Sequence, residues 1–390
     1  MRQALEGSQA IARTVALCRP QVVAAYPITP QTHIVENIAK LVADGKLDCE
    51  YISVESEFSA ASVVLGAAAA GSRTYTASAS QGILLMTEVL YNIAGMRIPM
   101  VMTCANRAIS APLSIWNDQQ DSMSVRDAGW IQLYCADNQE AVDTTIQAYR
   151  ISERTELPVM VCVDGFTLTH TLEPIDIPGQ EEVDRFLPPF TFSRALDTGK
   201  PISMGTLVSP DYYSEARHSH HQALLNAKQE IMAADTAWGD ICGRSYGGLL
   251  RIEGQENADI GILSLGSVMG TLSDARSEHP EADRIKLIQL RAFRPFPIEV
   301  LLQACDGLKH LVILERALSP GSGGIVGNEV RAALTELEQA PVIHSFAVGL
   351  GGRDIPLDLL DRLLQSIQSG PASRFEIYDL DLQKLPPEDQ

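Results

Sequence analysis

The feature that most constrains the fold of this 390-residue chain is a repeated alternation between apolar, strand-like segments and helix-like segments. The alternation begins near residue 7, stops over 171–257 and restarts at 258. Strands separated by helices at this rhythm pair in parallel, because each helix returns the chain across one face of the sheet. The sequence therefore predicts an α/β fold with a larger parallel-sheet domain first and a smaller one second.

The intervening region is rich in proline and acidic residues and shows no clean period until a predicted helix over about 212–238. His218, His220 and His221 are adjacent on that helix, and their spacing favours a solvated face over a metal site. The predicted strands are 22–28, 49–56, 74–79, 100–107, 158–166, 259–267, 285–293, 310–316 and 342–349, and the helices of the first block are 31–43, 57–71 and 82–95.

Composition excludes several classes of function. The net charge of −19 opposes binding to nucleic acid and to anionic membrane surfaces. The seven cysteines include no CxxC pair, so we expect reduced thiols and neither a disulfide framework nor a metal cluster within this chain. The N-terminal stretch has no continuous hydrophobic core and no apolar run reaches membrane-spanning length, so a cytoplasmic location is expected.

Polar residues follow the predicted strands of the first block, where the carboxyl ends of parallel strands meet at one edge of the sheet. Pro27 and Pro30 hold Ile28 and Thr29 extended, which fixes the Thr29 hydroxyl at that edge. Each polar residue also has a structural explanation, such as a helix-terminus role for Glu57. Their coincidence indicates a binding site. The polar residues are Thr29, Glu55, Glu57, Ser78, Ser80, Gln81, Asn106 and Arg107, and the last also has Asp118 and Asp121 as possible ion-pair partners.

Two glycine-bearing turns, "LGSVMG" at 265–270 and "SPGSGG" at 319–324, follow strands of the second block. Such turns can cradle an anion at a helix N-terminus. Neither turn fits a complete nucleotide-binding fingerprint, so nucleotide binding is not favoured.

A series of motifs gives the chain a resemblance to a known family. In this order they resemble the α subunit of the multi-subunit pyruvate:ferredoxin oxidoreductases and related 2-oxoacid oxidoreductases, from about residue 7 to 370. The resemblance implies a pyrimidine-binding thiamine diphosphate domain over 1–170, an irregular and helical connection over 171–257, a transketolase C-terminal-like domain over 258–370 and a tail over 371–390. The motifs are "AYPITPQT", "VESEFSA", "ASQG", "ANRAISAP", "DGFTLTH", "RPFP" and "ERALSPGSGG".

The resemblance also implies cofactors and partners. This chain is expected to hold the aminopyrimidine half of thiamine diphosphate. A β subunit is expected to hold the diphosphate, Mg²⁺ and the nearest [4Fe-4S] cluster, with ferredoxin-like and γ subunits completing a dimer of hetero-oligomers. The substrates are a 2-oxoacid and coenzyme A, and ferredoxin takes the electrons. The sequence has neither a cysteine cluster nor a GDG-type diphosphate motif, which is consistent with half of an active site.

By position in the motifs, Glu57 matches the glutamate that hydrogen-bonds the pyrimidine nitrogen, while Glu55 does not. Arg107 is expected to hold the substrate carboxylate and Thr29 to donate a hydrogen bond to the substrate. The remaining expected cofactor contacts are Tyr26, Pro27, Ile28, Ser80 and Gln81, and the remaining expected substrate contacts are Asn106, Trp116 and Asp118.

The loop "LSIWNDQQDSM" departs from the "NIHNDHSDAM"-like form of several family members. Gln119 and Gln120 replace a His-Ser pair, and Trp116 adds bulk, which leaves the 2-oxoacid open. Pyruvate is the expected substrate, with phenylglyoxylate or another aryl or branched 2-oxoacid as the alternative. A transketolase or decarboxylase without iron–sulfur partners, and a non-catalytic scaffold subunit, are the alternatives outside this activity.

Overall fold

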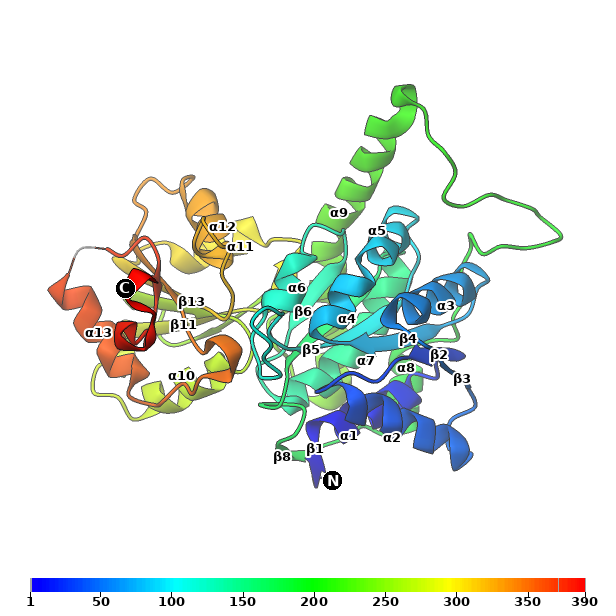
Figure 1. Cartoon of the computed structure of the whole chain (residues 1–390), viewed down its shortest axis with the longest axis horizontal. Helices are drawn as coiled ribbons and strands as arrows, with labels where there is room; N and C mark the ends of the chain where they lie inside the picture. Colours follow the sequence, from blue (N-terminus) through cyan, green and yellow to red (C-terminus); the bar gives the residue numbers. More distant parts are fainter. Residues whose placement is uncertain (1, 371, 390) are drawn as a thin grey trace.

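The chain forms two twisted sheets that lie side by side, each covered by helices on both faces (Figure 1). The computed structural model describes residues 2–370 and 372–389. One hydrophobic core runs from helix α3 beside the first sheet to strand β14 of the second, so apolar packing joins the two sheets. The predicted α/β class with parallel sheets is confirmed.

The first sheet has seven strands in the order β12-β6-β7-β5-β4-β2-β3. All neighbours pair in parallel except β12, which is antiparallel to β6. Its central strands are buried along their whole length, which explains why they read as continuous apolar runs. The strands are β2 (Val22–Ala25), β3 (Glu50–Ser53), β4 (Thr74–Ser78), β5 (Val101–Asn106), β6 (Ile131–Tyr134), β7 (Val159–Asp164) and β12 (Ala292–Arg294).

The two faces of this sheet carry different helices. Helices α1, α2 and α7 pack on one face, with α8 and α9 outside α7, and α3, α4 and α5 lie on the other. The predicted helix over 82–95 is divided into α4 and α5 at Met86. The helices are α1 (Gly7–Leu17), α2 (Thr32–Ala43), α3 (Glu57–Ala69), α4 (Ser80–Leu85), α5 (Thr87–Gly95), α6 (Gln120–Ser124), α7 (Asn138–Thr155), α8 (Gln180–Phe186) and α9 (Pro210–Cys242).

The second sheet has six strands in the order β15-β14-β13-β10-β11-β9. Strand β9 lies before residue 258 in sequence and pairs antiparallel with β11 at the edge. The predicted tail contributes β15, although residues 371 and 390 lie outside the described residues. The elements are β9 (Leu250–Glu253), β10 (Ile260–Ser264), α10 (Val268–Ser277), η1 (Ala282–Arg284), β11 (Ile285–Leu290), α11 (Ile298–Cys305), β13 (His310–Glu315), α12 (Ile325–Leu334), β14 (Val342–Ala347), η2 (Leu350–Gly352), α13 (Leu359–Ser369), β15 (Glu376–Ile377), η3 (Leu382–Lys384) and η4 (Pro387–Asp389).

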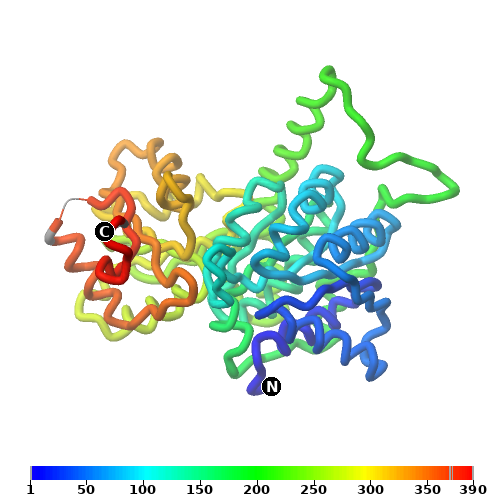
Figure 2. The backbone as a smooth tube through the Cα atoms, viewed as in Figure 1, coloured from blue at the N-terminus to red at the C-terminus, as the bar shows by residue number. Residues whose placement is uncertain are grey.

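A short antiparallel ribbon, β1 (Gln3–Glu6) with β8 (Leu172–Ile175), closes the first block. Between α8 and α9 the chain forms an arm that leaves the body of the protein and returns at the N-terminal end of α9 (Figure 2). The arm and the first turn of α9 expose Leu207, Tyr212 and Tyr213. These apolar side chains make the arm a candidate contact for another subunit.

The prediction that the three histidines of α9 share a solvated face is wrong for His220. His218 and His221 are exposed, but His220 is buried and its Nε2 lies 3.2 Å from the carbonyl oxygen of Gly129. The ring packs against Gly129, where even a Cβ atom would clash with it. His220 therefore anchors α9 to the segment before β6.

The N-termini of two helices in the second block are occupied by the chain's own carboxylates. Glu315 accepts hydrogen bonds from three consecutive backbone N–H groups of α12, beginning with Ile325 at 2.7 Å. Asp164 at the end of β7 accepts from the backbone N–H of Ser267, which precedes α10, at 2.8 Å. The glycine-bearing turns thus bind anions, as their sequences suggest, but these anions are side chains of the same chain.

A fully buried ion pair connects α7 to the strand junction that links the sheets. Arg291 Nε donates to Glu140 Oε1 at 3.1 Å, and neither side chain is exposed to solvent. Three of the four other guanidinium N–H groups donate to Gly248 O, Thr144 Oγ1 and Gln147 Oε1. Because Arg291 immediately precedes β12, this network fixes the point where the chain returns from the second sheet to the first.

We expect Arg291→Met to lower the free energy of unfolding by about 3–5 kcal/mol, because it leaves the buried Glu140 carboxylate without its cation. Urea denaturation measures the change. Arg284→Met is the matched control, since Arg284 is half exposed and pairs with Asp259 at the surface, and it is expected to cost about 1 kcal/mol or less. Equal losses in the two variants would contradict a special role for the buried pair.

Within the described residues, no helix combines the length and the apolar character that crossing a membrane requires.

Candidate functional site

The structure brings Thr29 and Arg107 into direct contact at the carboxyl edge of the first sheet. Arg107 Nη1 donates to the backbone carbonyl of Thr29 at 2.9 Å, and Nε donates to the carbonyl of Ser114 at 3.1 Å. Within the described chain the guanidinium forms no ion pair with Asp118 or Asp121, the two partners considered from sequence. Nη2 and one N–H of Nη1 therefore remain for a carboxylate that comes from outside.

Arg107 is positioned for such a role by burial. Its side chain lies under the loop that contains Ser114, and only 7% of the residue is exposed. Burial lowers its pKa, and the negative charge of Asp121 acts in the opposite direction. A cation that is shielded from water interacts more strongly with an incoming anion than an exposed one does.

Asp121 organises this edge, although sequence reasoning considered it only as an ion-pair partner of Arg107. Its Oδ2 accepts from the backbone N–H of Ser80 at 2.8 Å and of Arg107 at 3.0 Å. Its Oδ1 accepts from Asn106 Nδ2 at 2.8 Å and from the backbone N–H of Ser122 at 2.7 Å. The carboxylate is fully buried, which raises its pKa, and the four donors oppose that shift. It joins the ends of β4 and β5 to α6.

Glu57 is the first residue of α3 and only 6% of it is exposed. Its carboxylate lies against Gly82 of α4, where an added Cβ would come within 2.7 Å of Oε1. In the part of the chain that the structure describes, this carboxylate has no hydrogen-bond or ion-pair partner. Glu55 is exposed instead, and its carboxylate accepts a hydrogen bond from Ser59. The two glutamates thus have different surroundings, as the predicted helix start implied.

The other expected cofactor contacts lie at the ends of β2 and β4. Tyr26 and Pro27 are exposed and Ile28 is half-buried. Ser80 is buried and its hydroxyl donates to the carbonyl of Ala108, while Gln81 Nε2 is a buried donor without a partner. The structure therefore places one unsatisfied amide N–H group near the α4 N-terminus, on the residue immediately before the glycine that Glu57 contacts.

The remaining expected substrate contacts lie on or beside the loop that follows β5. Asn106 is buried and its Oδ1 has no partner, whereas Trp116 is 53% exposed and stacks on Phe166 with ring centroids 4.7 Å apart. Asp118 accepts from the backbone N–H of Gln120 at 3.0 Å and of Gly351 at 3.3 Å. Burial raises the pKa of Asp118 to about 6. Asp118 therefore tethers this loop to the second sheet.

A second link between the sheets was also not predicted from sequence. Asp164 receives Gln119 Nε2 at 3.1 Å and Arg316 Nη1 at 3.3 Å, in addition to the Ser267 backbone. Gln119 also donates its own backbone N–H to the carbonyl of Arg316 at 2.8 Å. The altered loop of the sequence is thus a structural bridge between the two blocks.

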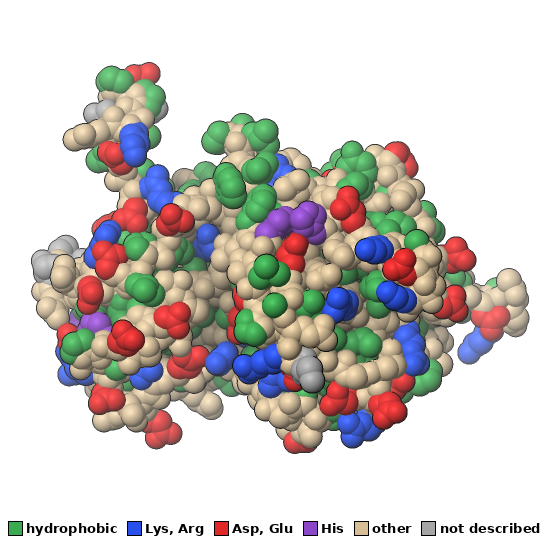
Figure 3. All heavy atoms as spheres, turned by 90° about the horizontal axis from the view of Figure 1, so that it is seen from below, with side chains coloured by type: hydrophobic (Ala, Val, Ile, Leu, Met, Phe, Trp, Pro, Cys, Tyr) green, Lys and Arg blue, Asp and Glu red, His purple; other side chains and the backbone are tan. Residues whose placement is uncertain are grey.

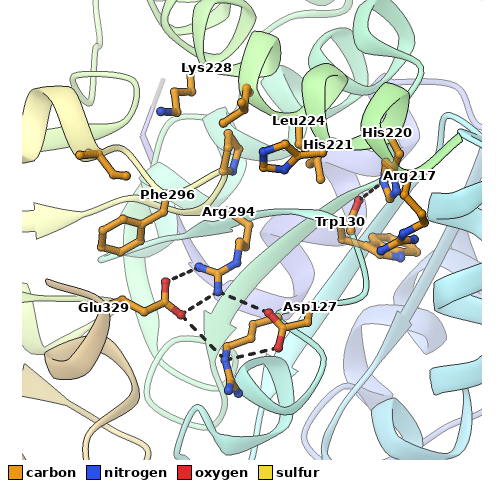
Figure 4. Close-up of a pocket in the computed structure, with 15 residues that line it drawn as sticks. Asp127, Trp130, Arg217, His220, His221, Leu224, Lys228, Arg294, Phe296 and Glu329 are labelled. Carbon is orange, nitrogen blue, oxygen red and sulfur yellow. Dashed lines mark hydrogen bonds and ion pairs between the residues drawn. The ribbon is translucent and has the colours of Figure 1, made fainter. Parts of the chain in front are cut away.

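A pocket of about 360 Å³ lies elsewhere, between α9, the segment before β6 and the chain after β12 (Figure 4). Its floor is apolar, with Trp130, Leu224 and Phe296. Arg294 forms two 2.7 Å hydrogen bonds to Glu329 and lies 3.6 Å from Asp127. Because Arg294 is compensated by these carboxylates and the pocket contains none of the predicted site residues, the pocket is separate from the candidate site.

Comparison with known proteins identifies the family. The domain family described as "Pyruvate flavodoxin/ferredoxin oxidoreductase, thiamine diP-bdg" matches residues 13–235. The domain family described as "Pyruvate:ferredoxin oxidoreductase core domain II" matches residues 258–360. The chain belongs to the pyruvate:ferredoxin oxidoreductase family.

Several members of this oxidoreductase family are similar to this chain over nearly their full length. Pyruvate synthase subunit PorA of Methanosarcina barkeri is 43% identical over 96% of this chain and 94% of its own. PorA of Methanothermobacter thermautotrophicus is 46% identical over 90% and 91%. Ketoisovalerate oxidoreductase subunit VorA of Pyrococcus horikoshii is 40% identical over 91% and 90%. The predicted family and the predicted oxidoreductase class are confirmed.

Solved structures confirm the predicted fold of this family member. A 2-oxoglutarate:ferredoxin oxidoreductase from Magnetococcus marinus superposes with a TM-score of 0.71 at 19% identity. The match covers 93% of this chain, which spans 65% of the length of that one. A split-gene transketolase gives a TM-score of 0.50 at 12% identity over 92% and 93% of the two chains. Both have the thiamine-enzyme fold that the sequence predicts.

We expect Asp121→Asn to lower the free energy of unfolding of this oxidoreductase subunit by about 2–5 kcal/mol. In wild type, four N–H groups donate to the two carboxylate oxygens of Asp121. Asparagine replaces one of these oxygens with an NH2 group, so that buried N–H donors point at another donor and lose their acceptor. Thermal or urea unfolding measures the loss. Asp127→Asn, on the exposed side of the same segment, is the control and is expected to change stability by about 0.5 kcal/mol or less.

An unchanged stability of Asp121→Asn would show that the four hydrogen bonds at the sheet edge are dispensable.

Proposed function

We propose that this chain is the α subunit of a pyruvate synthase, a thiamine-diphosphate-dependent 2-oxoacid:ferredoxin oxidoreductase. The complex converts pyruvate, coenzyme A and oxidised ferredoxin to acetyl-coenzyme A, CO₂ and reduced ferredoxin. The PorA relatives, 43–46% identical over at least 90% of this chain, support the reaction. The observation that carries the assignment to a site is the buried carboxylate of Glu57, which has no partner among the described residues.

The surroundings of Glu57 fit the aminopyrimidine of thiamine diphosphate. A buried carboxylate without an internal partner is costly unless a ligand supplies a hydrogen bond. Gly82 leaves space beside Oε1 that a larger residue would fill, and the unsatisfied Ser78 Oγ lies next to the same glycine. Glu57 would hold the pyrimidine nitrogen there. The other contacts proposed for the cofactor are Tyr26, Pro27, Ile28, Ser80 and Gln81.

Bound thiamine diphosphate supplies a nucleophilic thiazolium carbon for decarboxylation of a 2-oxoacid. Glu57 contributes by sharing a proton with the pyrimidine nitrogen in a site where water does not compete for it. Its place in the first turn of α3 puts it at the positive end of the helix dipole. Glu57 is therefore the acid–base group that we assign to this chain.

The substrate carboxylate is assigned to Arg107. Its free N–H groups lie beside the Thr29 carbonyl, so the same contact that orients the guanidinium also holds the Thr29 segment in place. The Thr29 hydroxyl is exposed at this edge and is assigned as a donor to the substrate. Asn106, with its unsatisfied Oδ1, together with Trp116 and Asp118, completes the proposed substrate contacts.

The chain supplies half of the site in this proposal. A β subunit holds the diphosphate, Mg²⁺ and the nearest [4Fe-4S] cluster, and γ and ferredoxin-like subunits complete a dimer of hetero-oligomers in the cytoplasm. Domain 1–170 is assigned to the pyrimidine, 171–257 to the connection, 258–370 to the C-terminal domain and 371–390 to a tail. Large exposed apolar side chains after β2 and on β3, α3, α4 and α5 favour a partner subunit on this part of the first block. They are Tyr26, Ile52, Phe58, Leu84, Leu85 and Tyr91.

Glu57→Gln keeps the shape of the side chain but cannot share a proton, so we expect turnover of the assembled complex to fall by roughly 10² or more. The assay follows coenzyme A-dependent reduction of ferredoxin by pyruvate. Glu55→Gln is the matched control, because Glu55 is exposed and contacts only Ser59 among described residues, and it is expected to retain activity.

Full activity of Glu57→Gln, or loss in Glu55→Gln alone, would overturn the assignment of the glutamate. The same assay with a panel of 2-oxoacids tests the substrate. Pyruvate is expected to give the highest kcat/KM. A preference for a branched or aryl 2-oxoacid would instead favour the alternative proposal, an oxidoreductase for such acids, and VorA is a relative named for a branched one. If none of these 2-oxoacids supports the reduction of ferredoxin, the proposed function itself is contradicted.

A further inference from the structure

A cluster of three potential metal ligands lies on the first block, apart from Glu57 and Gly82. Glu6 ends β1, His33 is in the first turn of α2, and His170 follows β7 in the turn before β8. Their ligand atoms all lie within 4.8 Å of one another. Histidine side chains gather beside a carboxylate on the face of the molecule seen in Figure 3. Because these residues are more than 25 positions apart in sequence, no spacing motif reveals them.

The contacts within the cluster are close. Nδ1 of His33 lies 2.6 Å from Oε1 of Glu6. The rings of His33 and His170 have centroids 4.6 Å apart at an interplanar angle of 35°. Two imidazoles this close repel each other when both are protonated, and one carboxylate compensates one positive charge. A divalent cation between neutral imidazoles and the carboxylate removes that conflict.

The surrounding backbone holds all three residues in place. Glu6 pairs with Leu172 in the β1–β8 ribbon, which brings the end of β1 next to the turn that contains His170. Nδ1 of His170 lies 2.8 Å from Thr169 Oγ1, which in turn accepts the backbone N–H of Phe166 at 2.8 Å. This contact leaves Nε2 of His170 as the nitrogen open to a metal, since within the described chain Nε2 has no hydrogen-bond partner.

We propose that Glu6, His33 and His170 bind a divalent transition-metal ion of the Zn²⁺ type. Two imidazoles and one carboxylate form a ligand set typical of Zn²⁺ and its neighbours, with the remaining coordination position open to water. The Thr169 hydroxyl would accept the Nδ1–H of His170, the kind of second contact that orients metal-bound histidines. Side chains of His33 and Glu6 are 45% and 30% exposed, so both can rotate toward an ion.

The site adjoins the candidate active site without belonging to it. The ring of His170 stacks on Phe166 at 4.8 Å, and Phe166 stacks on Trp116. A bound ion would connect β1, α2 and the turn after β7. It would thereby stabilise that turn, whose Phe166 packs against Trp116. The proposal does not depend on the reaction catalysed, because it rests on the three side chains alone.

Metal binding is tested on the full chain without a histidine tag and after removal of metals. Co²⁺ is the probe, because ligation by nitrogen and oxygen in a site of low coordination gives it a visible absorption that Zn²⁺ then abolishes by displacement. We expect one Co²⁺ per chain and an increase in Tm, because the unfolded chain does not assemble the site. His33→Asn and His170→Asn are each expected to weaken binding by about tenfold or more.

Two controls distinguish metal binding at this site from metal binding by other histidine and cysteine side chains. His218→Asn changes an exposed histidine on α9, and the pair Cys49→Ser with Cys242→Ser removes the half-exposed thiols; both should leave affinity unchanged. Since His33 is exposed, His33→Asn is expected to fold normally, and circular dichroism verifies this. Failure of the chain to bind Co²⁺ or Zn²⁺ below about 1 mM, or equal binding by His33→Asn and wild type, would overturn the proposal and leave an ordinary His33–Glu6 ion pair.

Discussion

The structure depends on buried carboxylates that satisfy backbone N–H groups at the carboxyl edges of the two sheets. Asp121 joins the ends of β4 and β5, Asp164 reaches the N-terminus of α10, and Glu315 occupies the N-terminus of α12. Each removes a cluster of donors from solvent without an external ion, at the desolvation cost that burial of a charge carries. For Glu315 that cost raises the pKa to about 7 despite three N–H donors.

Glu57 differs from these carboxylates in a way that supports the proposed cofactor site. It is buried at a helix N-terminus as they are, yet within the described chain nothing donates to it. The N-termini of α4, α10 and α12 are in contrast already occupied by carboxylates of the chain itself, namely Asp121, Asp164 and Glu315. Under the proposed function, Glu57 offers a partner for the pyrimidine ring of the cofactor, while these three helix N-termini in the described chain are not open to its diphosphate, which a partner subunit would hold.

The sequence predicted the features that depend on short, local patterns. Continuous apolar runs identified the buried parallel strands, and the polar residues after them identified Thr29, Glu57 and Arg107 as neighbours of one edge. The predicted strand over 285–293 divides at Arg291 into β11 and β12, and this division was not predicted, because β12 pairs with β6 across some 160 positions. The role of Asp121 was not predicted either, because three of its four N–H donors are backbone groups that no pattern displays. His220 had a usable signal: it is in phase with the buried Ala227, Ile231, Ala234 and Trp238 of α9.

The central claim is that this chain carries only the pyrimidine half of a thiamine diphosphate site, and titration calorimetry tests it most directly. The isolated full chain is titrated with thiamine diphosphate and Mg²⁺, and then with the β subunit added. We predict no saturable binding below about 1 mM for the chain alone and tight binding, with activity, once the β subunit is present. Binding by the isolated chain at about 1 µM or tighter would contradict the account and indicate a complete cofactor site within these 390 residues.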